Sequence, residues 1–397
     1  MKILVIHPHI FCGGAEKAVI YLVYWLRKMG VEADILTLSV NLDNLPEIAS
    51  TLNYLIPDKM TYSSSSASVS DIFEIIFKET YKIHACLEKI KDDYDLLNPH
   101  NLPSYWATFF KNKPPTVWMC NEIAGVYGTL KDVVEKNFLL KCSIAAGRYL
   151  DRCLVRHYID EIVTLNQWHA QKVERTYGIR PKIVSTGVDV SFFSMGTQKK
   201  IIEKYALDNS FILSHVGALI PRKGQELSIR AVSILKSSIP NIRLLIVGTG
   251  PAEHRLKRLV KEKNLQSHVI FLGLVPDEEL RDIYHCAHIN LFPVCDQSWG
   301  MVPFEAMLGG AINIVSNDCG ASIVIKENNL GYVVSELNEQ KLSEVILHVY
   351  QNYQEIVKEI KERAKEYVKN NLTWEKYAEG MFNVFQNCLN KRNYTKV

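Results

Sequence analysis

Segments typical of strands and of helices alternate without interruption between residues 211 and 316, and this alternation constrains the fold more than any other feature of the chain. Each short run rich in Val, Ile and Leu is followed by a stretch whose apolar residues recur at helical spacing. Such repeated strand–helix–strand units indicate a parallel sheet in an α/β domain. We predict strands at 211–216, 243–247, 269–272, 289–292 and 312–316, and helices at 225–237, 253–263, 277–285 and 303–308.

The beginning of the chain has the same pattern. Residues 2–6 form a strand-like run, Gly13 and Gly14 mark a turn, and a helical pattern ends at Gly30. A second strand, predicted as one continuous segment at 33–40, completes a unit that also implies a parallel sheet. Further strands are predicted at 95–98, 116–120, 161–165 and 182–185, and the last stretch, 340–389, is predicted to be helical.

With 397 residues, the chain is long for one hydrophobic core and fits two domains. A mostly polar stretch that starts at residue 191 marks the boundary between them. We therefore predict two Rossmann-like domains, at residues 1–190 and 191–375, and a C-terminal helix at 376–397 that packs back on the first domain. Because open parallel sheets bind ligands at the carboxyl ends of their strands, we expect the two domains to face a central cleft.

Charge and cysteine content exclude several classes of protein. The 46 Lys and Arg residues against 43 Asp and Glu leave a net charge of +3, which is too small for a general nucleic-acid binder. None of the nine cysteines forms a CxxC pair, which is typical of reduced thiols rather than of disulfides or zinc sites. No stretch reaches the roughly 18 apolar residues of a membrane span. We expect a cytoplasmic protein that is neither secreted nor membrane-spanning.

Glycine-rich turns follow two of the predicted strands. Gly13 and Gly14 open a helix, where bare backbone amides suit an anion, although such a pair is often only turn geometry. The segment that starts at Gly248 has the look of a dinucleotide-binding loop, but Glu253 stands at the place of its third glycine, so an NAD site is disfavoured. The sequence Asp-Tyr-Asp at 93–95 leads into a strand, and we expect no metal there.

Two further loops carry groups suited to a phosphorylated ligand. Arg222 and Lys223 follow the strand at 211–216, where the two cations could neutralise a diphosphate; the alternative is a solvated pair near a helix start. After the strand at 289–292, a proline begins a helix whose first amides point at a ligand. Glu305 lies one turn into this apolar helix, and a buried glutamate needs a partner, which favours a binding site over packing.

Taken together, these and neighbouring segments resemble the family 4 retaining glycosyltransferases of the GT-B fold. The similarity spans nearly the whole chain, from Lys2 to about Trp374, and rests on the order and spacing of the motifs. It implies transfer of a sugar from a nucleoside diphosphate sugar, held by the C-terminal domain, to an acceptor on the N-terminal side, with no metal or other cofactor. The segments that carry the resemblance are GGAEKAVIYLVYWLRKMG, STGVDVSFF, VGALIPRKGQELSIRAV, LLIVGTGP, VIFLGLVPDEELRDIYHCAHINLFP and WGMVPFEAMLGGAINIVSND.

The resemblance also implies roles for single residues. Glu305 is similar to the glutamate that binds the ribose hydroxyls of the donor nucleotide, and Lys223 to the lysine on the diphosphate. The amides of Met301 and Val302 would hold phosphate oxygens. The expected donor-binding residues are Glu305, Gly300, Met301, Val302, Trp299, Gly248, Gly13 and Gly14, and the expected catalytic residues are Lys223, Arg222, Gln297 and His100.

Three positions depart from the family pattern. Ala218 replaces the arginine before the phosphate lysine, so either Arg222 supplies that charge or the charge is lost. Gln297 replaces the first glutamate of a pair, and Asn121 stands where relatives often have a histidine. His100 lies nearby in the pattern and could do similar work, although a lone histidine is more often structural. The departures leave two alternatives open: a donor-binding but inactive partner subunit, and a nucleotide-sugar epimerase.

The acceptor is the least defined part of this interpretation. Lys141, Arg148, Arg152 and Arg156 fall at spacings of seven, four and four, which places them on one face of a helix. Such a basic stripe suits the inner face of an anionic membrane and an acceptor that is a lipid-linked or cell-surface glycan precursor. The alternative is a solvated helix face.

Overall fold

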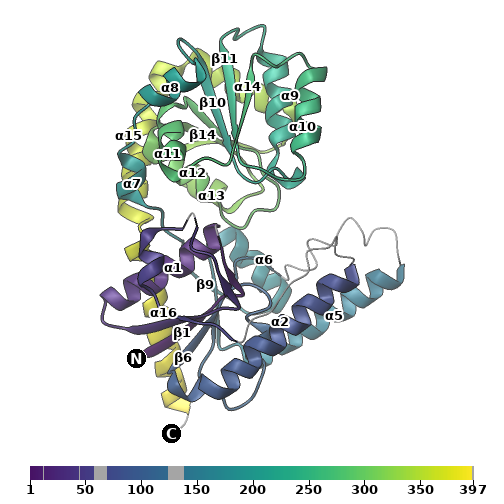
Figure 1. Ribbon diagram of the computed structural model, residues 1–397, viewed down its shortest axis with the longest axis vertical. Helices are drawn as coiled ribbons and strands as arrows, with labels where there is room; N and C mark the ends of the chain where they lie inside the picture. Colours follow the sequence, from purple (N-terminus) through teal and green to yellow (C-terminus); the bar gives the residue numbers. More distant parts are fainter. Residues whose placement is uncertain (12, 44, 58–68, 124–137, 396–397) are drawn as a thin grey trace. The chain divides into compact units, whose positions relative to one another are not determined.

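The computed structural model describes residues 1–11, 13–43, 45–57, 69–123 and 138–395, in two compact units (Figure 1). The first unit comprises Met1–Ser185 and Trp374–Val397, and the second comprises Thr186–Thr373. The sequence-based boundaries stand at 190 and 375, a few residues later in each case. The chain thus leaves the first unit once and returns to it with its last helix.

The second unit is built on a six-stranded parallel sheet with the strand order β12-β11-β10-β13-β14-β15. This confirms the predicted α/β class, and three strands have the predicted bounds to the residue: β10 (Phe211–Val216), β13 (Ile289–Phe292) and β14 (Ile312–Ser316). Their runs of Val, Ile, Leu and Phe are buried because both faces of the sheet are covered. The other strands are β11 (Ile242–Val247), β12 (Val269–Gly273) and β15 (Gly331–Val334).

Helices of the second unit cover both faces of its sheet. Helices α9 and α10 lie on one side, and α11 and α12 on the other, as right-handed crossovers between parallel strands require (Figure 1). The predicted helical stretch 340–389 is not continuous, because it breaks at Asn352 and again at Leu372 and Thr373. The helices are α7 (Val190–Ser194), α8 (Lys199–Tyr205), α9 (Gln225–Leu235), α10 (Glu253–Glu262), α11 (Asp277–Cys286), α12 (Val302–Gly309), α13 (Gly320–Glu327), α14 (Glu339–Gln351) and α15 (Tyr353–Asn371), with a short 3-10 helix η4 (Pro221–Lys223).

The first unit also contains parallel strands, in the order β5-β3-β1-β6, followed by β7-β8-β9. The bridges from Leu97 to Thr116 and from His100 to Met119 connect these two sets. The strand predicted at 33–40 is wrong as one element, because the Thr37 hydroxyl and the Leu38 amide both bond to the carbonyl of Pro8 and interrupt it. The strands are β1 (Lys2–Ile6), β2 (His9–Ile10), β3 (Glu32–Leu36), β4 (Ser39–Val40), β5 (Tyr54–Leu55), β6 (Leu96–Pro99), β7 (Val117–Met119), β8 (Glu161–Thr164) and β9 (Lys182–Ile183).

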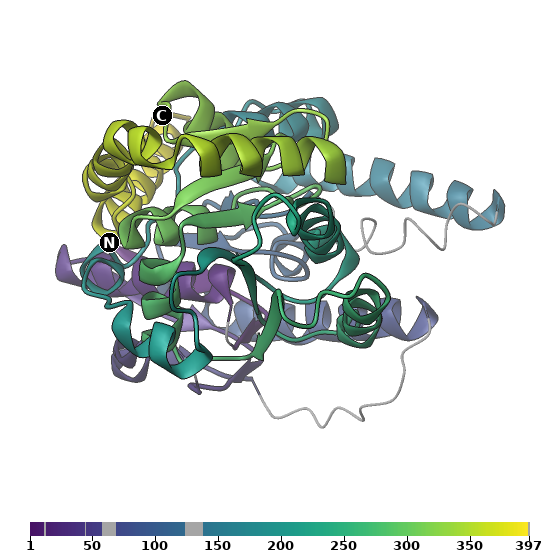
Figure 2. The same ribbon diagram turned by 90° about the horizontal axis from the view of Figure 1, so that it is seen from above.

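The C-terminal helix α16 (Trp374–Thr395) packs on α1 (Gly14–Lys28) of the first unit. The ring of Trp374 stacks on Tyr21 with 4.5 Å between centroids, and Lys391 forms an ion pair with Glu161. Helices α2 and α5 extend in the same direction but lie apart when seen from above (Figure 2). No helix in the described part of the chain is long and apolar enough to cross a membrane. The remaining helices are α2 (Val69–Ile90), α5 (Phe138–Tyr158), α6 (Gln167–Tyr177) and the 3-10 helices η1 (Glu47–Thr51), η2 (Lys91–Asp93) and η3 (Trp106–Thr108).

Candidate functional site

In the second unit, the loops after the adjacent strands β10 and β13 bring three of the expected catalytic residues together. Lys223 Nζ donates a hydrogen bond to Gln297 Oε1 at 2.7 Å, and Arg222 Nη1 donates to the same oxygen at 3.2 Å. The parallel pairing of β10 with β13 places both loops at the same edge of the sheet. Two side-chain cations therefore converge on one uncharged amide oxygen at the carboxyl ends of the strands.

The loop that carries Lys223 is held by groups that sequence reasoning did not identify. His215 Nε2 donates to the Lys223 carbonyl at 3.0 Å, and its Nδ1 accepts from the Ser228 hydroxyl at 2.9 Å. Burial lowers the pKa of His215 to about 4, so the ring is neutral and acts as a fixed brace. Gly224 has φ +77, and a Cβ there would collide with the carbonyl of Pro293, so only glycine fits this turn. The signal that could have indicated this brace is His215 itself, a polar residue inside the mostly apolar run 211–216.

Gln297 is fixed through its backbone as well as its side chain. Its amide donates to the Asp318 carbonyl at 3.2 Å, and its carbonyl accepts from the Gly320 amide at 2.9 Å. The preceding residue, Asp296, has φ +48 and donates its amide to the Asp318 carboxylate at 2.8 Å. This clamp leaves the side-chain amide of Gln297 as the adjustable part of the segment.

Glu305 is 7% exposed in α12, and its Oε2 accepts a hydrogen bond from the Tyr284 hydroxyl at 3.0 Å. Burial and the neighbouring carboxylate raise the pKa of Tyr284 well above its usual range, so the tyrosine remains a donor. Sequence reasoning anticipated that this buried glutamate needs a partner but did not identify Tyr284. A carboxylate can accept several hydrogen bonds, so Glu305 has the chemistry to bind hydroxyl groups.

A buried ladder of polar side chains orients the start of α12. The Ser214 hydroxyl donates to Asn290 Oδ1 at 3.1 Å, and Asn290 Nδ2 donates to Asn313 Oδ1 at 2.7 Å. Asn313 Nδ2 then donates to the carbonyl of Pro303, in the first turn of the helix, at 3.0 Å. The ladder runs across β10, β13 and β14 and so ties the helix start to the centre of the sheet.

The other expected donor contacts in this unit have strong packing roles. The indole of Trp299 is 3% exposed and stacks on Phe304 with 5.0 Å between centroids. A Cβ at Gly300 would meet the Phe292 ring at 2.7 Å, and a Cβ at Gly248 would collide with the carbonyl of Gly217. Met301 is the N-cap of α12 and Val302 its first residue, so their amides belong to the set that has no intrahelical acceptor.

In the first unit, the Gly13 turn is already close to an anionic group. Gly13 is the N-cap of α1, and a Cβ there would collide with the carboxylate of Glu16, which turns back onto the helix start that opens at Gly14. Burial raises the pKa of Glu16. The turn where we expected a bound anion is therefore already occupied by a carboxylate of the protein. Glu16 could not be assigned to this turn from the sequence.

His100 lies at the end of β6 and is fully buried. Its Nε2 bonds to Asn98 Oδ1 at 2.9 Å, and Asn98 Nδ2 donates to the Val117 carbonyl at 2.7 Å. Burial and the nearby His7 hold the pKa of His100 well below its usual value. Asn121, after β7, donates from Nδ2 to Asn101 Oδ1 at 3.0 Å. His100 and Asn121 thus lie at the same end of neighbouring strands, as their places in the sequence suggested.

The basic stripe on α5 is partly engaged within the unit. Arg156 Nε donates to the carbonyl of Tyr177 at 2.5 Å, at the C-terminal end of α6, where a cation is favourable. Arg152 lies at the same helix end, since its guanidinium is 3.5 Å from a Cβ built at Gly178. Arg148 is exposed, and the side chain of Lys141 lies outside the described residues.

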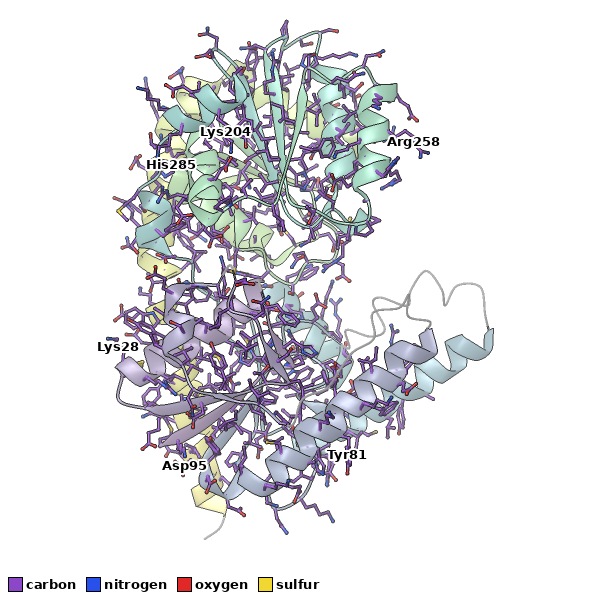
Figure 3. The ribbon with its side chains drawn as sticks, in the orientation of Figure 1. Lys28, Tyr81, Asp95, Lys204, Arg258 and His285 are labelled. Carbon is purple, nitrogen blue, oxygen red and sulfur yellow. The ribbon has the colours of Figure 1, made fainter. Side chains whose placement is uncertain are left out.

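Among the residues that the structure describes, carboxylates near the ends of strands do not gather into a metal site. Asp93 lies in η2, and Asp95 accepts a hydrogen bond from the Lys2 amide at 2.7 Å at the start of β6 (Figure 3). Within the described ranges, no group of three or more His, Cys, Asp or Glu side chains is placed to hold a metal ion.

Parts of the sequence are similar to known glycosyltransferases. A D-inositol 3-phosphate glycosyltransferase of Corynebacterium glutamicum is 26% identical over 264 residues, which cover 62% of this chain and 61% of that protein. A GDP-mannose-dependent alpha-(1-6)-phosphatidylinositol monomannoside mannosyltransferase of Mycolicibacterium smegmatis is 29% identical over 157 residues, covering 37% and 41%. The chain spans less than two thirds of the length of these relatives, and 48% and 42% of two others.

The structure of HepE from Anabaena in complex with UDP-glucose has 16% sequence identity and a TM-score of 0.73, covering 98% of this chain and 100% of that chain. At this identity the likeness concerns the fold. The sequence of residues 197–370 matches the family described as glycosyl transferases group 1. Residues 197–370 of this chain are thus similar to the group 1 glycosyl transferases, and the chain has the GT-B fold of two Rossmann-like domains.

Proposed function

We propose that the chain is a retaining hexosyltransferase of family 4, which moves a sugar from a nucleoside diphosphate sugar to an acceptor hydroxyl. The observation that carries this proposal is the convergence of Lys223 and Arg222 on Gln297, at the carboxyl ends of β10 and β13. Two cations at this edge of the sheet suit a diphosphate, and Glu305 in the following helix suits the hydroxyls of a ribose. Met301 and Val302 would offer their amides to phosphate oxygens.

The chemistry that these groups support is a substitution at the anomeric carbon. The bond from that carbon to the diphosphate breaks, a bond to the acceptor oxygen forms, and the acceptor proton passes to a phosphate oxygen of the leaving group on the same face. Lys223 and Arg222 would neutralise the charge that develops on the diphosphate. In this proposal neither a protein nucleophile nor a metal takes part.

Gln297 differs from a glutamate in its charge, but it can still take part in this task. Its neutral Oε1 accepts from both cations and adds no negative charge beside them. Its Nε2 retains two donors for hydroxyls of the transferred sugar. In the same proposal, Gly13 and Gly14 border the donor phosphate and the acceptor, and His100, which is fully buried, acts by supporting its neighbours.

Removing the carboxylate of Glu305 tests the nucleotide-binding part of the proposal. We expect Glu305→Ala to weaken the binding of the preferred nucleoside diphosphate by roughly 1 to 3 kcal/mol, because a charged hydrogen-bond partner is lost. Calorimetry with UDP, GDP and ADP measures this. Tyr284→Phe is the matched control, since it removes the hydroxyl that faces Glu305 but keeps the carboxylate. Unchanged affinity in Glu305→Ala would remove this residue from the site.

We also propose that the protein works in the cytoplasm, in peripheral contact with the inner membrane face, on a lipid-linked or cell-surface glycan precursor. Helix α5 exposes 71% of Tyr149 and 58% of Leu150 next to the exposed Arg148, and apolar side chains beside a cation suit an anionic lipid interface. The name of the mannosyltransferase relative describes a phosphatidylinositol-based acceptor, which agrees with a lipid substrate here.

Vesicle flotation tests the membrane contact. Arg148→Glu should weaken binding to phosphatidylglycerol vesicles by about 1 kcal/mol per unit of charge changed, and Tyr149→Ser with Leu150→Ser should weaken it further. Arg258→Glu is the matched control, because Arg258 is an exposed arginine on α10 of the second unit (Figure 3). If the wild-type chain stays with the soluble fraction at low salt, the proposed membrane contact is wrong and a soluble acceptor is favoured.

The two alternatives predict different products. A donor-binding but inactive partner subunit would bind nucleotide sugars without transferring or hydrolysing them, and the replacements at Ala218 and Asn121 would explain its inactivity. An epimerase would release a modified donor without any acceptor. Product analysis with nucleotide sugars, with and without a membrane extract as acceptor, separates both from the transferase.

A further inference from the structure

Three polar side chains at one edge of the first unit's sheet form a chain of hydrogen bonds. His7 follows β1, Asn101 follows β6 and Asn121 follows β7, so all three lie at the carboxyl ends of parallel strands. Asn101 Nδ2 is 3.1 Å from His7 Nε2, and Asn121 Nδ2 donates to Asn101 Oδ1 at 3.0 Å. At its inner end, His7 Nδ1 lies 2.7 Å from the His9 carbonyl oxygen.

The donor and the acceptor of each hydrogen bond in this series follow from the bond between His7 and the His9 carbonyl oxygen. A carbonyl oxygen can only accept, so His7 Nδ1 carries the proton. Burial lowers the pKa of His7 to about 4, which keeps the ring neutral and leaves Nε2 without a proton. Nε2 therefore accepts from Asn101 Nδ2, and Asn101 Oδ1 is then the end that accepts from Asn121. An amide has one donor end and one acceptor end, so the last member of the chain, Asn121, is left with its acceptor Oδ1.

The reverse arrangement of the two amides is disfavoured by the same contacts. Turning both amides would direct Asn101 Oδ1 at His7 Nε2, which would then need a second proton on a fully buried ring. Asn101 is also held at φ +55, a left-handed conformation that asparagine tolerates better than most residues. His7 and Asn101 are thus held in one orientation, and this orientation determines which end of the Asn121 amide donates and which accepts.

Accessibility increases along the chain of bonds. His7 is 2% exposed, whereas Asn101 and Asn121 are half-buried. In the described parts of the chain, no residue donates to Asn121 Oδ1. His100, whose ring centroid is 6.4 Å from that of His7, has the same character, because its Nε2 is committed to Asn98 and its buried Nδ1 has no partner. Because His100 is fully buried, Asn121 Oδ1 is the accessible acceptor of the two, and it suits the O–H group of a sugar.

We propose that Asn121 Oδ1 accepts a hydrogen bond from a hydroxyl of the sugar substrate, and that His7 and Asn101 are positioning residues that hold the Asn121 amide in this orientation. The proposal rests on the transferase function proposed above and adds to it a selection for a hydroxyl donor at a defined point. A substrate group that can only accept, such as an ether or a fluorine at that carbon, would face a second acceptor and be rejected.

Kinetics of four variants test the proposal, with kcat/KM for transfer from the preferred nucleotide sugar as the measurement. Asn121→Leu should lower kcat/KM about tenfold, and Asn121→Asp should retain more activity than Asn121→Leu because its oxygens accept. Asn101→Gly keeps the left-handed backbone, removes the amide that orients Asn121, and should cost about fivefold. In the Asn121→Asp background, Asn101→Gly should not lower kcat/KM further, because a carboxylate has two equivalent oxygens and needs no residue to fix its orientation.

Two kinetic outcomes would overturn the proposal. If Asn101→Gly costs as much in the Asn121→Asp background as in the wild type, Asn101 does not act through Asn121. If Asn121→Asp is as impaired as Asn121→Leu, both alone and combined with Asn101→Gly, then Asn121 donates to the substrate rather than accepts from it.

The proton positions can be measured without any substrate, by two-bond 1H–15N correlation spectra of the histidine rings. We expect His7 to carry its proton on Nδ1. His288 is the internal control, because its Nδ1 accepts from the Ile212 amide at 3.1 Å and its proton must be on Nε2. A proton on Nε2 of His7 would overturn the positioning role at any level of activity. If the wild-type chain neither transfers nor hydrolyses nucleotide sugars, the proposed transferase function is wrong. The spectra still show whether His7 holds the Asn101 and Asn121 amides in the proposed orientation.

Discussion

Replacing Lys223 by alanine is expected to lower kcat for sugar transfer by about a hundredfold or more, because the departing diphosphate loses a fixed cation where its charge develops. The ammonium group lies 2.7 Å from Gln297 Oε1, on a loop that His215 braces through the Lys223 carbonyl. Its position is thus set before the substrate binds, which is the condition for a large electrostatic contribution. Steady-state transfer rates with a panel of nucleotide sugars measure the effect.

Arg222→Ala shows whether the site uses one cation or two. Arg222 reaches the same oxygen at 3.2 Å, and its loss should cost about as much as that of Lys223 only if it has replaced the charge that is missing at Ala218. Arg258→Ala, an exposed arginine change in the same unit, is the control for general charge effects. Wild-type rates in Lys223→Ala would mean that the diphosphate is neutralised elsewhere, and the proposed mechanism would have to be abandoned.

Gln297→Ala is expected to lower kcat/KM by about ten- to a hundredfold, while affinity for the bare nucleotide remains close to that of the wild type. The change removes the oxygen that aligns Lys223 with Arg222 and leaves a hydroxyl of the transferred sugar without its partner. The backbone clamp to Asp318 and Gly320 does not involve the side chain, so the loop should keep its path. Calorimetry of the nucleotide and kinetics of the sugar donor separate the two effects.

Gln297→Glu distinguishes an active enzyme from an inactive partner subunit. A carboxylate restores the group that relatives have at this position, so this variant should remain active with a changed preference among sugar donors. The contrary result is an inactive wild type that gains transfer through Gln297→Glu. The natural chain would then be a donor-binding partner, and the retained Lys223 and Glu305 would serve binding alone.

The α/β class and much of the strand pattern could be predicted from the sequence, because both depend on local periodicity. A strand buried on both faces needs an uninterrupted apolar run, and this requirement is visible in 211–216, 289–292 and 312–316, whose predicted ends agree with β10, β13 and β14. The pattern is less informative where a strand is interrupted by side-chain bonds, as at Thr37, or where a helix such as α2 carries exposed apolar residues such as Phe77.

For the candidate site too, single residues could be predicted from the sequence but their contacts could not. The sequence alone identified Lys223 and Gln297 in loops after apolar strands and Glu305 in the helix that follows one of them, but the partners of these residues are distant along the chain. Gln297 lies 74 positions from Lys223, and Asn101 lies 94 positions from His7. Such a contact cannot be predicted from the periodicity of the sequence, because it depends on which strands become neighbours in the sheet.

The sequence by itself determined the kind of sheet, the loops that carry the chemistry and the charges available there, since each of these follows from the order of residues within one strand and its turn. Only the tertiary structure decided how those groups are oriented. It turned Glu16 onto the Gly13 turn, placed Arg156 on the end of α6 and set the direction of the amides at Asn101 and Asn121. The physical reason is that a hydrogen bond has a direction, and that direction is fixed only when both partners are in place.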